Sequence, residues 1–316
     1  MPPRPSDRWH RPRHRNRRLW IPLLISGFVV ALASLESSAP VLRRANALGR
    51  RCSPDHFASP ASSSGGDILR PRIAIVSFSD DREGLAASRG GGRPRRSFRG
   101  VMETVEGNKR AYAAGMGYDF IDAKGLVDRS RPPNWSKILA VRSHLPYYDW
   151  VFWNDADTVV MNPAIELENI LIAVIGHSDF HASPDLVVTE DFNGVNSGVF
   201  FVRRSAWSES FLDTWWNLTS FIRFDSTKSG DNAAMEHLIG RLPPEESRVH
   251  VGVAPMQCLF NSYPWFPTWK SVYRLIFSPW TTWQGAYSDG DFMVHLAGLD
   301  DKRRWAAKFL QQMRTI

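Results

Sequence analysis

Cysteine is almost absent from this chain, because only Cys52 and Cys258 occur among its 316 residues. Two cysteines cannot form the disulfide framework of a small secreted domain, and neither lies in a C-x-x-C metal-binding motif. The sequence leaves one bridge between them open, although it would tie a segment expected to be a stem to the folded domain. Internal repeats are absent as well, which argues against a repeat architecture.

Nucleic-acid-binding motifs are also missing: the chain has neither zinc-finger spacing nor an RNP-type aromatic motif. Its net charge of +7 has a local origin, since seven arginines lie in the first eighteen residues and a second basic cluster spans 89–99. Charges of both signs are mixed elsewhere. A basic tail explains the charge better than a nucleic-acid groove, so we expect no nucleic-acid partner.

Charged residues are missing from residues 19–35, whose sequence is LWIPLLISGFVVALASL. Seventeen residues at about 1.5 Å each reach about 26 Å, the short limit for crossing a bilayer. We expect a transmembrane signal anchor here, with 1–18 as a cytoplasmic basic tail and the rest of the chain in the lumen. A signal peptide cleaved after the Ala31–Ala33 stretch and an organellar transit peptide are the alternatives.

The remaining chain divides into a stem and one large domain. Residues 36–70 are rich in Ser, Ala, Pro, Arg and Gly without periodicity, which predicts a flexible stem before a domain at 71–316. Strands are expected at 72–78, 118–122, 149–154, 186–189, 198–202 and 249–253, and helices at 101–115, 135–144, 207–216 and 231–239. This alternation predicts an α/β fold with a largely parallel sheet. A Gly- and Arg-rich stretch at 88–100 either approaches a diphosphate or is a disordered, solvated loop, and its composition favours the loop.

Asp155 and Asp157 directly follow an apolar strand. Ligands of parallel sheets bind outside the carboxyl ends of the strands, which is where this pair lies. Both carboxylates face one side if the strand continues, and a bend after Asp155 would also let them share an ion. Converging carboxylates repel unless a cation neutralises them, and their oxygens suit Mg²⁺ or Mn²⁺. A D-x-D pair by itself is usually a solvated turn, so its position is what favours a metal site.

For each of four further polar residues, the sequence allows both a structural role and a functional role. His295 is either a satisfied core histidine or the imidazole of a two-carboxylate, one-histidine metal site. Asn193 and Asn196 either form a tight turn, with Asn in a left-handed conformation, or bind sugar hydroxyls through their amides. Asp231 either caps a helix or brings a carboxylate to a reacting sugar, and composition favours the cap.

Several motifs follow one another in an order that resembles one known family. They are Trp135-x-Lys137, DWVFWNDAD at 149–157, Asn162-Pro163, DFNGVNSGVFFVR at 191–203, FLDTWW at 211–216, NSYP at 261–264 and GDFMVHLAG at 290–298. Together they are similar to the galactosyl transferase GMA12/MNN10 family, glycosyltransferase family 34, over roughly residues 72–305. The specificity of the resemblance comes from the ordered set rather than from D-x-D alone.

The resemblance implies a GT-A, Rossmann-like nucleotide-sugar-binding fold in a single-pass type II Golgi membrane protein. It implies a retaining transferase that needs Mn²⁺ (or Mg²⁺) and a donor such as UDP-galactose, UDP-xylose or GDP-mannose. The acceptor would be a glycan or glycoprotein, and the family includes subunits of multi-enzyme complexes. The alternative is a non-catalytic GT-A-fold subunit of a Golgi glycosylation complex.

The resemblance also assigns roles to individual residues. The metal ligands would be Asp155, Asp157 and His295, the catalytic residues Asp231 and Asn196, and the donor-binding residues Lys137, Asn193, Asn232 and Gly298.

The chain departs from the family pattern in three places. Gly230-Asp231-Asn232 stands where the family commonly has D-Q. Leu299 replaces a cysteine that often follows the histidine segment, and a cysteine common in the helix that here contains Lys109 is missing. These losses imply that a structural disulfide of the family is absent.

Overall fold

The structure is a computed structural model that describes residues 38–57, 70–80, 98–182, 184–224, 230–266 and 268–314. The anchor expected at 19–35 and all but the last three residues of the loop expected at 88–100 lie outside these ranges. Within them, no helix combines the length and the apolar composition needed to cross a bilayer.

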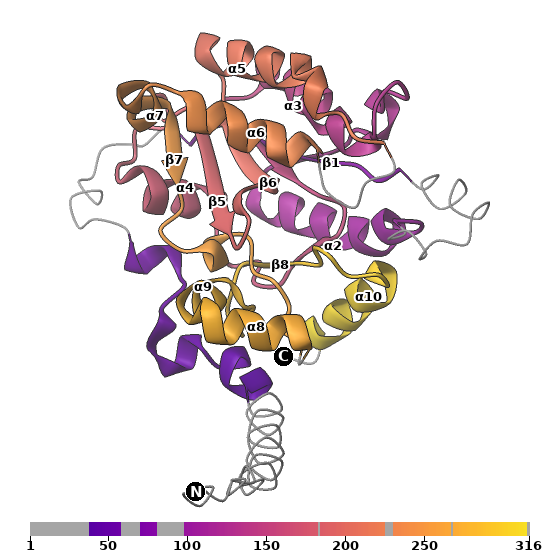
Figure 1. The fold of residues 1–316 in the computed structure, drawn as a ribbon, viewed down its shortest axis with the longest axis vertical. Coiled ribbons are helices and arrows are strands. Elements are labelled where there is room, and N and C mark those ends of the chain that lie inside the picture. Colours follow the sequence, from indigo (N-terminus) through magenta and orange to yellow (C-terminus); the bar gives the residue numbers. More distant parts are fainter. Residues whose placement is uncertain are drawn as a thin grey trace, which may run out of the picture.

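A six-stranded sheet forms the centre of the molecule, with strand order β2-β1-β3-β6-β5-β7 (Figure 1). Its strands are β1 (Ile73–Ser77), β2 (Asp119–Asp122), β3 (Trp150–Asn154), β5 (Leu186–Asp191), β6 (Gly194–Arg203) and β7 (Val251–Val253). Pairing is parallel throughout except that β6 runs antiparallel to both of its neighbours, β3 and β5. The predicted α/β fold with a largely parallel sheet is therefore confirmed.

Helices cover both faces of this sheet, which explains why the central strands β1 and β3 are buried at every position. One face carries α3 (Ser136–His144), α5 (Ala206–Asn217) and α6 (Gly230–Arg241), and the other carries α2 (Val101–Met116) and α4 (Leu167–Ile175). In β3, the side chains of Trp150 and Phe152 join the α2 and α4 side, while Val151 and Trp153 join the α3 side. This alternation follows the two-residue period of a strand.

A second, two-stranded sheet lies below the main one in Figure 1. It pairs β4 (Thr158–Val160) with β8 (Met293–His295) in antiparallel register, and Thr158 lies opposite His295. Helix α10 (Lys302–Met313) and α2 pack together against it and bury Val159 and Val294. This pairing fixes the distance between β8 and the acidic turn, although more than 130 residues separate them in sequence. Three further helices are α7 (Pro244–His250), α8 (Trp269–Phe277) and α9 (Pro279–Gly285).

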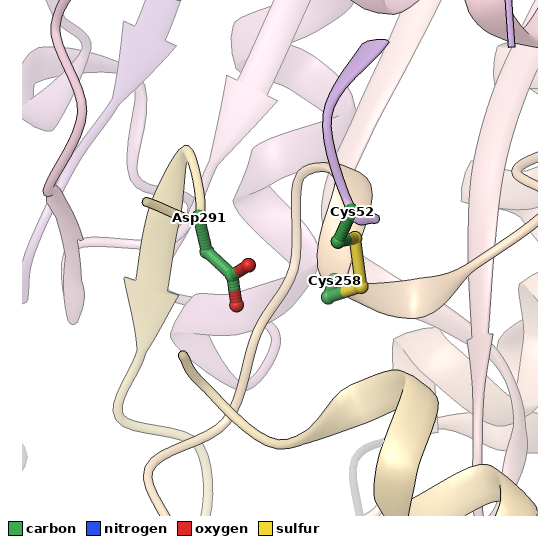
Figure 2. A group of neighbouring side chains, drawn as sticks. All are labelled: Cys52, Cys258 and Asp291. Atoms are coloured by element: carbon green, nitrogen blue, oxygen red, sulfur yellow. A yellow bond between two sulfur atoms is a disulfide. The ribbon is translucent and has the colours of Figure 1, made fainter. Parts of the chain in front are cut away.

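The segment 38–57 is folded onto the domain, in contrast to the flexible stem expected over 36–70. Cys52 and Cys258 form a disulfide, so the bridge that the sequence left open is present (Figure 2). Nearby, the guanidinium of Arg50 pairs with Asp291, and both side chains are fully buried. The sequence hides this docking, because it depends on a buried ion pair and a covalent bond rather than on apolar periodicity.

Asp291 lies beside the two sulfurs in Figure 2. Its carboxylate accepts hydrogen bonds from the side chains of Asn46 and Ser262. Burial raises the pKa of Asp291, against the opposing pull of Arg50. Because both sulfurs are used in the disulfide, this group is a structural junction and not a metal site.

Candidate active site

The acidic turn is a bend rather than a continued strand. Strand β3 ends at Asn154, and the backbone N–H of Thr158 donates to the carbonyl of Asp155 at 3.2 Å. The N–H of Asp155 in turn donates to the carbonyl of Gly198 at 2.8 Å, which ties the turn to β6. Of the two geometries weighed from the sequence, the second one holds: the chain turns after Asp155, and the turn brings both carboxylates to one place.

Asp155, Asp157 and His295 meet at this turn, and each offers a ligand atom within 4.8 Å of the other two. Nε2 of His295 lies 3.5 Å from Oδ1 of Asp157. That same Oδ1 is buried and receives no hydrogen bond. A buried carboxylate oxygen without a partner is costly, and a cation at this position would remove the cost. Two carboxylates and one imidazole also form a donor set that suits Mn²⁺, so the residues present fit a divalent metal.

Asn261 orients the imidazole of His295. The Asn261 side-chain amide donates to Oγ1 of Thr189 at 2.8 Å and to Oδ1 of Asn196 at 3.1 Å. Its carbonyl oxygen is therefore left to accept from Nδ1 of His295, at 2.8 Å. Because Nδ1 then carries the proton, Nε2 presents a lone pair on the side of Asp157. This is the outer-shell arrangement that fixes a histidine ligand.

Lys302 keeps Asp157 charged. Its ammonium contacts Oδ2 of Asp157 and donates to the carbonyl of Leu296 at 2.8 Å. Burial would raise the pKa of Asp157, but the opposite charge of Lys302 counters burial, and this pKa lies well below its usual range. One oxygen of Asp157 thus serves Lys302, and the other is left for a cation.

Lys137 links the acidic turn to α6. Its buried ammonium lies 3.1 Å from Oδ1 of Asp155 and 3.0 Å from Oδ2 of Asp231, and donates to the carbonyl of Ser197 at 2.9 Å. Burial lowers the pKa of Lys137, but the two carboxylates more than reverse this, so the lysine is charged. These three contacts match the three N–H donors of the ammonium. Contact of Lys137 with the donor phosphates stays a prediction.

Asp231 lies inside the first turn of α6, and not at the cap position that composition favours. Its side chain is fully buried. Asn134 donates to its Oδ1, and Ser197 Oγ donates to its Oδ2 at 3.1 Å. Both oxygens are thus engaged by the protein, which gives Asp231 a clear part in holding Lys137. Contact with a donor sugar stays a prediction.

The other expected donor-binding residues are placed differently. Asn232 clamps β6, since its Oδ1 accepts from the N–H of Ser197 at 2.6 Å and its Nδ2 donates to the carbonyl of Val195 at 2.9 Å. Gly298 is exposed in the turn after β8, with a φ of 79°. Contact of these two residues with a donor stays a prediction.

Asn196 belongs to the network around the site, whereas Asn193 does not. The Asn196 amide donates to Asp191 Oδ2 at 3.0 Å and to the Tyr263 hydroxyl oxygen at 2.8 Å. Its carbonyl oxygen accepts from Asn261, the residue that holds His295. Asn193 is exposed in the β5–β6 turn, where the left-handed residue is Gly194 (φ 94°) and not an asparagine.

Four residues that the sequence did not single out complete the site. Asn261 holds His295, Lys302 pairs with Asp157, and Lys109 supports the turn through the carbonyl of Asp155 at 2.9 Å. The fourth is Gly198: a Cβ there would lie 2.5 Å from Cε1 of His295. The sequence offered a weak signal for two of them, because Asn261 and Gly198 lie within motifs of the resemblance. The two lysines carry no local pattern.

Two curated proteins are similar to this chain in sequence. The chain is 28% identical over 266 residues to the probable alpha-1,6-mannosyltransferase MNN10 of Saccharomyces cerevisiae, covering 72% of this chain and 62% of that one. It is 24% identical over 246 residues to an alpha-1,2-galactosyltransferase of Schizosaccharomyces pombe, covering 68% and 60%. The chain thus spans about three fifths of the length of these curated relatives.

Among solved structures, a glycosyltransferase involved in the glycosylation of the major capsid of PBCV-1 superposes with a TM-score of 0.48 at 14% identity, over 78% of this chain and all of that one. The model of the galactosyl transferase GMA12/MNN10 family matches residues 85–177 and 176–306, which is most of the chain. The ordered motifs and this match lead to the same conclusion: the chain belongs to the galactosyl transferase GMA12/MNN10 family.

Proposed function

We propose that the chain is a metal-dependent glycosyltransferase of the GT-A type, which moves a sugar from a nucleotide-sugar donor to a hydroxyl of a glycan acceptor with retention. One observation carries the proposal: Asp155, Asp157 and His295 converge on a buried carboxylate oxygen that no hydrogen bond satisfies. Family membership supports the transferase activity, and the acidic turn at the end of β3 supports a donor site at that edge of the sheet.

The three converging residues would hold Mn²⁺ or Mg²⁺. A bound cation of this kind supplies Lewis-acid stabilisation to the diphosphate that leaves with the nucleotide. The chain's own residues prepare the site: Asn261 presents Nε2 of His295, and Lys302 keeps Asp157 ionised. Such preorganised charge is effective because it needs little rearrangement during reaction.

The ammonium of Lys137 contacts the carboxylate of Asp155. In this position it holds the carboxylate in place and adds to the potential that attracts an anionic donor. Asp231 fixes the lysine from the other side. We propose that this lysine–carboxylate chain sets the position of the donor sugar relative to the acceptor.

The finer assignments are proposals as well. The donor is UDP-galactose, UDP-xylose or GDP-mannose, and the acceptor is a glycan or glycoprotein. The uncharged segment 19–35 supports a type II membrane anchor with the domain in the Golgi lumen, in complex with other glycosyltransferases.

The second candidate is a non-catalytic subunit of such a complex. Two observations favour it: the family's usual D-Q is replaced at Asp231-Asn232, and the side chains of both residues are engaged by the protein itself. A subunit of this kind would keep the metal site and bind a donor without turning it over.

The test uses the full chain in detergent or nanodiscs with each of the three donors, in Mn²⁺ and in EDTA. One donor should be transferred or hydrolysed in Mn²⁺, and both EDTA and Asp157→Asn should abolish this turnover. Asp213→Asn makes the same chemical change at an exposed ion pair and should leave turnover intact. Undiminished turnover in EDTA would refute the metal role, and donor binding without turnover would support the second candidate.

A further inference from the structure

Helices α8 and α9 present a large apolar face to solvent. Trp269, Tyr273, Ile276, Phe277 and Trp280 are each between 63% and 67% exposed. The first four recur at helical spacing along one side of α8, and the fifth lies at the start of α9. Single exposed apolar residues are ordinary, but a contiguous face of five large ones marks an interaction surface.

The composition of this face suits a lipid surface. Two tryptophans and one tyrosine combine apolar rings with polar N–H and O–H groups, the chemistry favoured at the boundary between lipid and water. The stretch 269–285 contains no acidic residue and carries Lys270 and Arg274. Arg274 turns inward and stacks over the ring of Phe192, so α8 is held on the domain while its apolar side faces outward.

The face also lies beside the start of the described chain. The indole of Trp265, four residues before α8, donates to the hydroxyl of Ser38 at 3.0 Å. Arg50 donates to the carbonyl of Trp283 in α9 at 3.2 Å. Figure 1 shows the indigo N-terminal segment against α8 and α9 on the same side of the molecule.

We propose that the outward face of α8 and α9 rests on the bilayer in which residues 19–35 are anchored. The inference depends on that anchor, which is part of the proposed function. Only two residues separate Leu35 from Ser38, and such a link reaches about 10 Å even when extended. Ser38, and Trp265 bonded to it, therefore lie close to the membrane surface.

Two attachments determine how the domain sits on the membrane. A single anchor would leave the domain free to rotate, whereas a second contact through α8 fixes which side faces the lipid. Interfacial helices of this type bury their apolar side about 5–10 Å into the headgroup region. The bilayer is the occupant that chain length and side-chain chemistry both favour, and a second copy of the chain is the competing outcome.

The test reconstitutes the full chain in vesicles and labels one introduced cysteine with an environment-sensitive fluorophore. Phe277→Cys places the label on the face, and Ile276→Cys is a second variant in case the first does not fold. Tyr147→Cys is the matched control, since Tyr147 is as exposed as Phe277 (66% each) and lies in a different part of the fold, between α3 and β3. Cys52 and Cys258 do not interfere, because both are in the disulfide.

In vesicles that contain a quencher lipid, the label at 277 or 276 should lose at least roughly twofold more emission than the label at 147, given the expected depth of insertion. Vesicle flotation shows whether the chain is bound to the membrane. If the chain floats with the vesicles but the labels at 277, 276 and 147 lose equal emission, the inference is overturned and the anchor stays intact. Crosslinking between two copies through position 277, without quenching, would overturn it in favour of a dimer. Failure of the chain to float with the vesicles would contradict both the anchor and the second contact.

Discussion

Replacing Gly198 with alanine would test how closely the metal site is packed. A Cβ at this position would lie 2.5 Å from Cε1 of His295, 3.0 Å from Oδ1 of Asn196 and 3.1 Å from Oδ2 of Asp155. The φ of Gly198 is not in the left-handed region, so alanine strains no backbone torsion there. The added methyl group therefore acts only on the surrounding side chains.

The size of the effect follows from these contacts. Carbon atoms pack at about 3.5–4.0 Å, so the imidazole of His295 would have to move by about 1 Å. Metal–ligand distances tolerate only about ±0.2 Å, so a shift of that size removes a ligand from its position. We expect the affinity for Mn²⁺ to fall about 10–100-fold, as it does when outer-shell support is lost. Overpacking should also lower the free energy of unfolding by about 1–3 kcal/mol.

Titration of Mn²⁺ followed calorimetrically measures the affinity, and urea denaturation measures the stability. Gly240→Ala is the matched control, because nothing lies within 4 Å of a Cβ there. Alanine at that position in α6 should leave Mn²⁺ binding unchanged and slightly stabilise the helix. If Gly198→Ala bound Mn²⁺ as tightly as the unaltered chain, the proposed arrangement of His295 and Asp155 would be refuted.

Three further predictions follow from individual contacts. Asn261→Ala should weaken Mn²⁺ binding about 10–100-fold by releasing Nδ1 of His295, and an unchanged titration would contradict this role. Serine at both Cys52 and Cys258 should lower the free energy of unfolding by about 2–5 kcal/mol, checked by urea denaturation. Burial lowers the pKa of Lys109 to about 7, so the cost of its charge is fully present below pH 7 and declines as pH rises toward the unfolded value of about 10.4. The stability of Lys109→Met relative to the unaltered chain should therefore decrease between pH 7 and 10, and a pH-independent difference would argue against a lowered pKa.

The sequence predicted those parts of the fold that depend on local pattern. Strand β3 is an unbroken apolar run buried on both faces, and it ends at an acidic pair, so its placement needed no tertiary information. The convergence of Asp155, Asp157 and His295 was also predicted: the residues alone left His295 open between a core histidine and a metal ligand, and the family resemblance assigned it to the metal. Neither argument could determine whether the chain bends after Asp155, since that depends on the carbonyls of β6 and on the pairing of β4 with β8.

Features that depend on long-range pairing were hidden from the sequence. Lys302 in α10 is an ordinary lysine by pattern, yet it contacts Asp157, which lies 145 residues away. The disulfide joins residues 206 positions apart, and the sequence could only leave it open because it ties an expected stem to the folded domain. The flexible stem was a wrong prediction for residues 38–57, because the buried ion pair of Arg50 with Asp291 secures a segment whose composition resembles a linker.

The central claim is that one divalent cation is held jointly by Asp155, Asp157 and His295. Crystals of the protein soaked in MnCl₂ test it directly, because the anomalous signal of manganese marks the ion without reference to any model of the site. The account predicts a single strong peak within about 2.0–2.3 Å of a carboxylate oxygen from each aspartate and of Nε2 of the histidine. A manganese peak elsewhere, or one that contacts neither Asp157 Oδ1 nor His295, would contradict it.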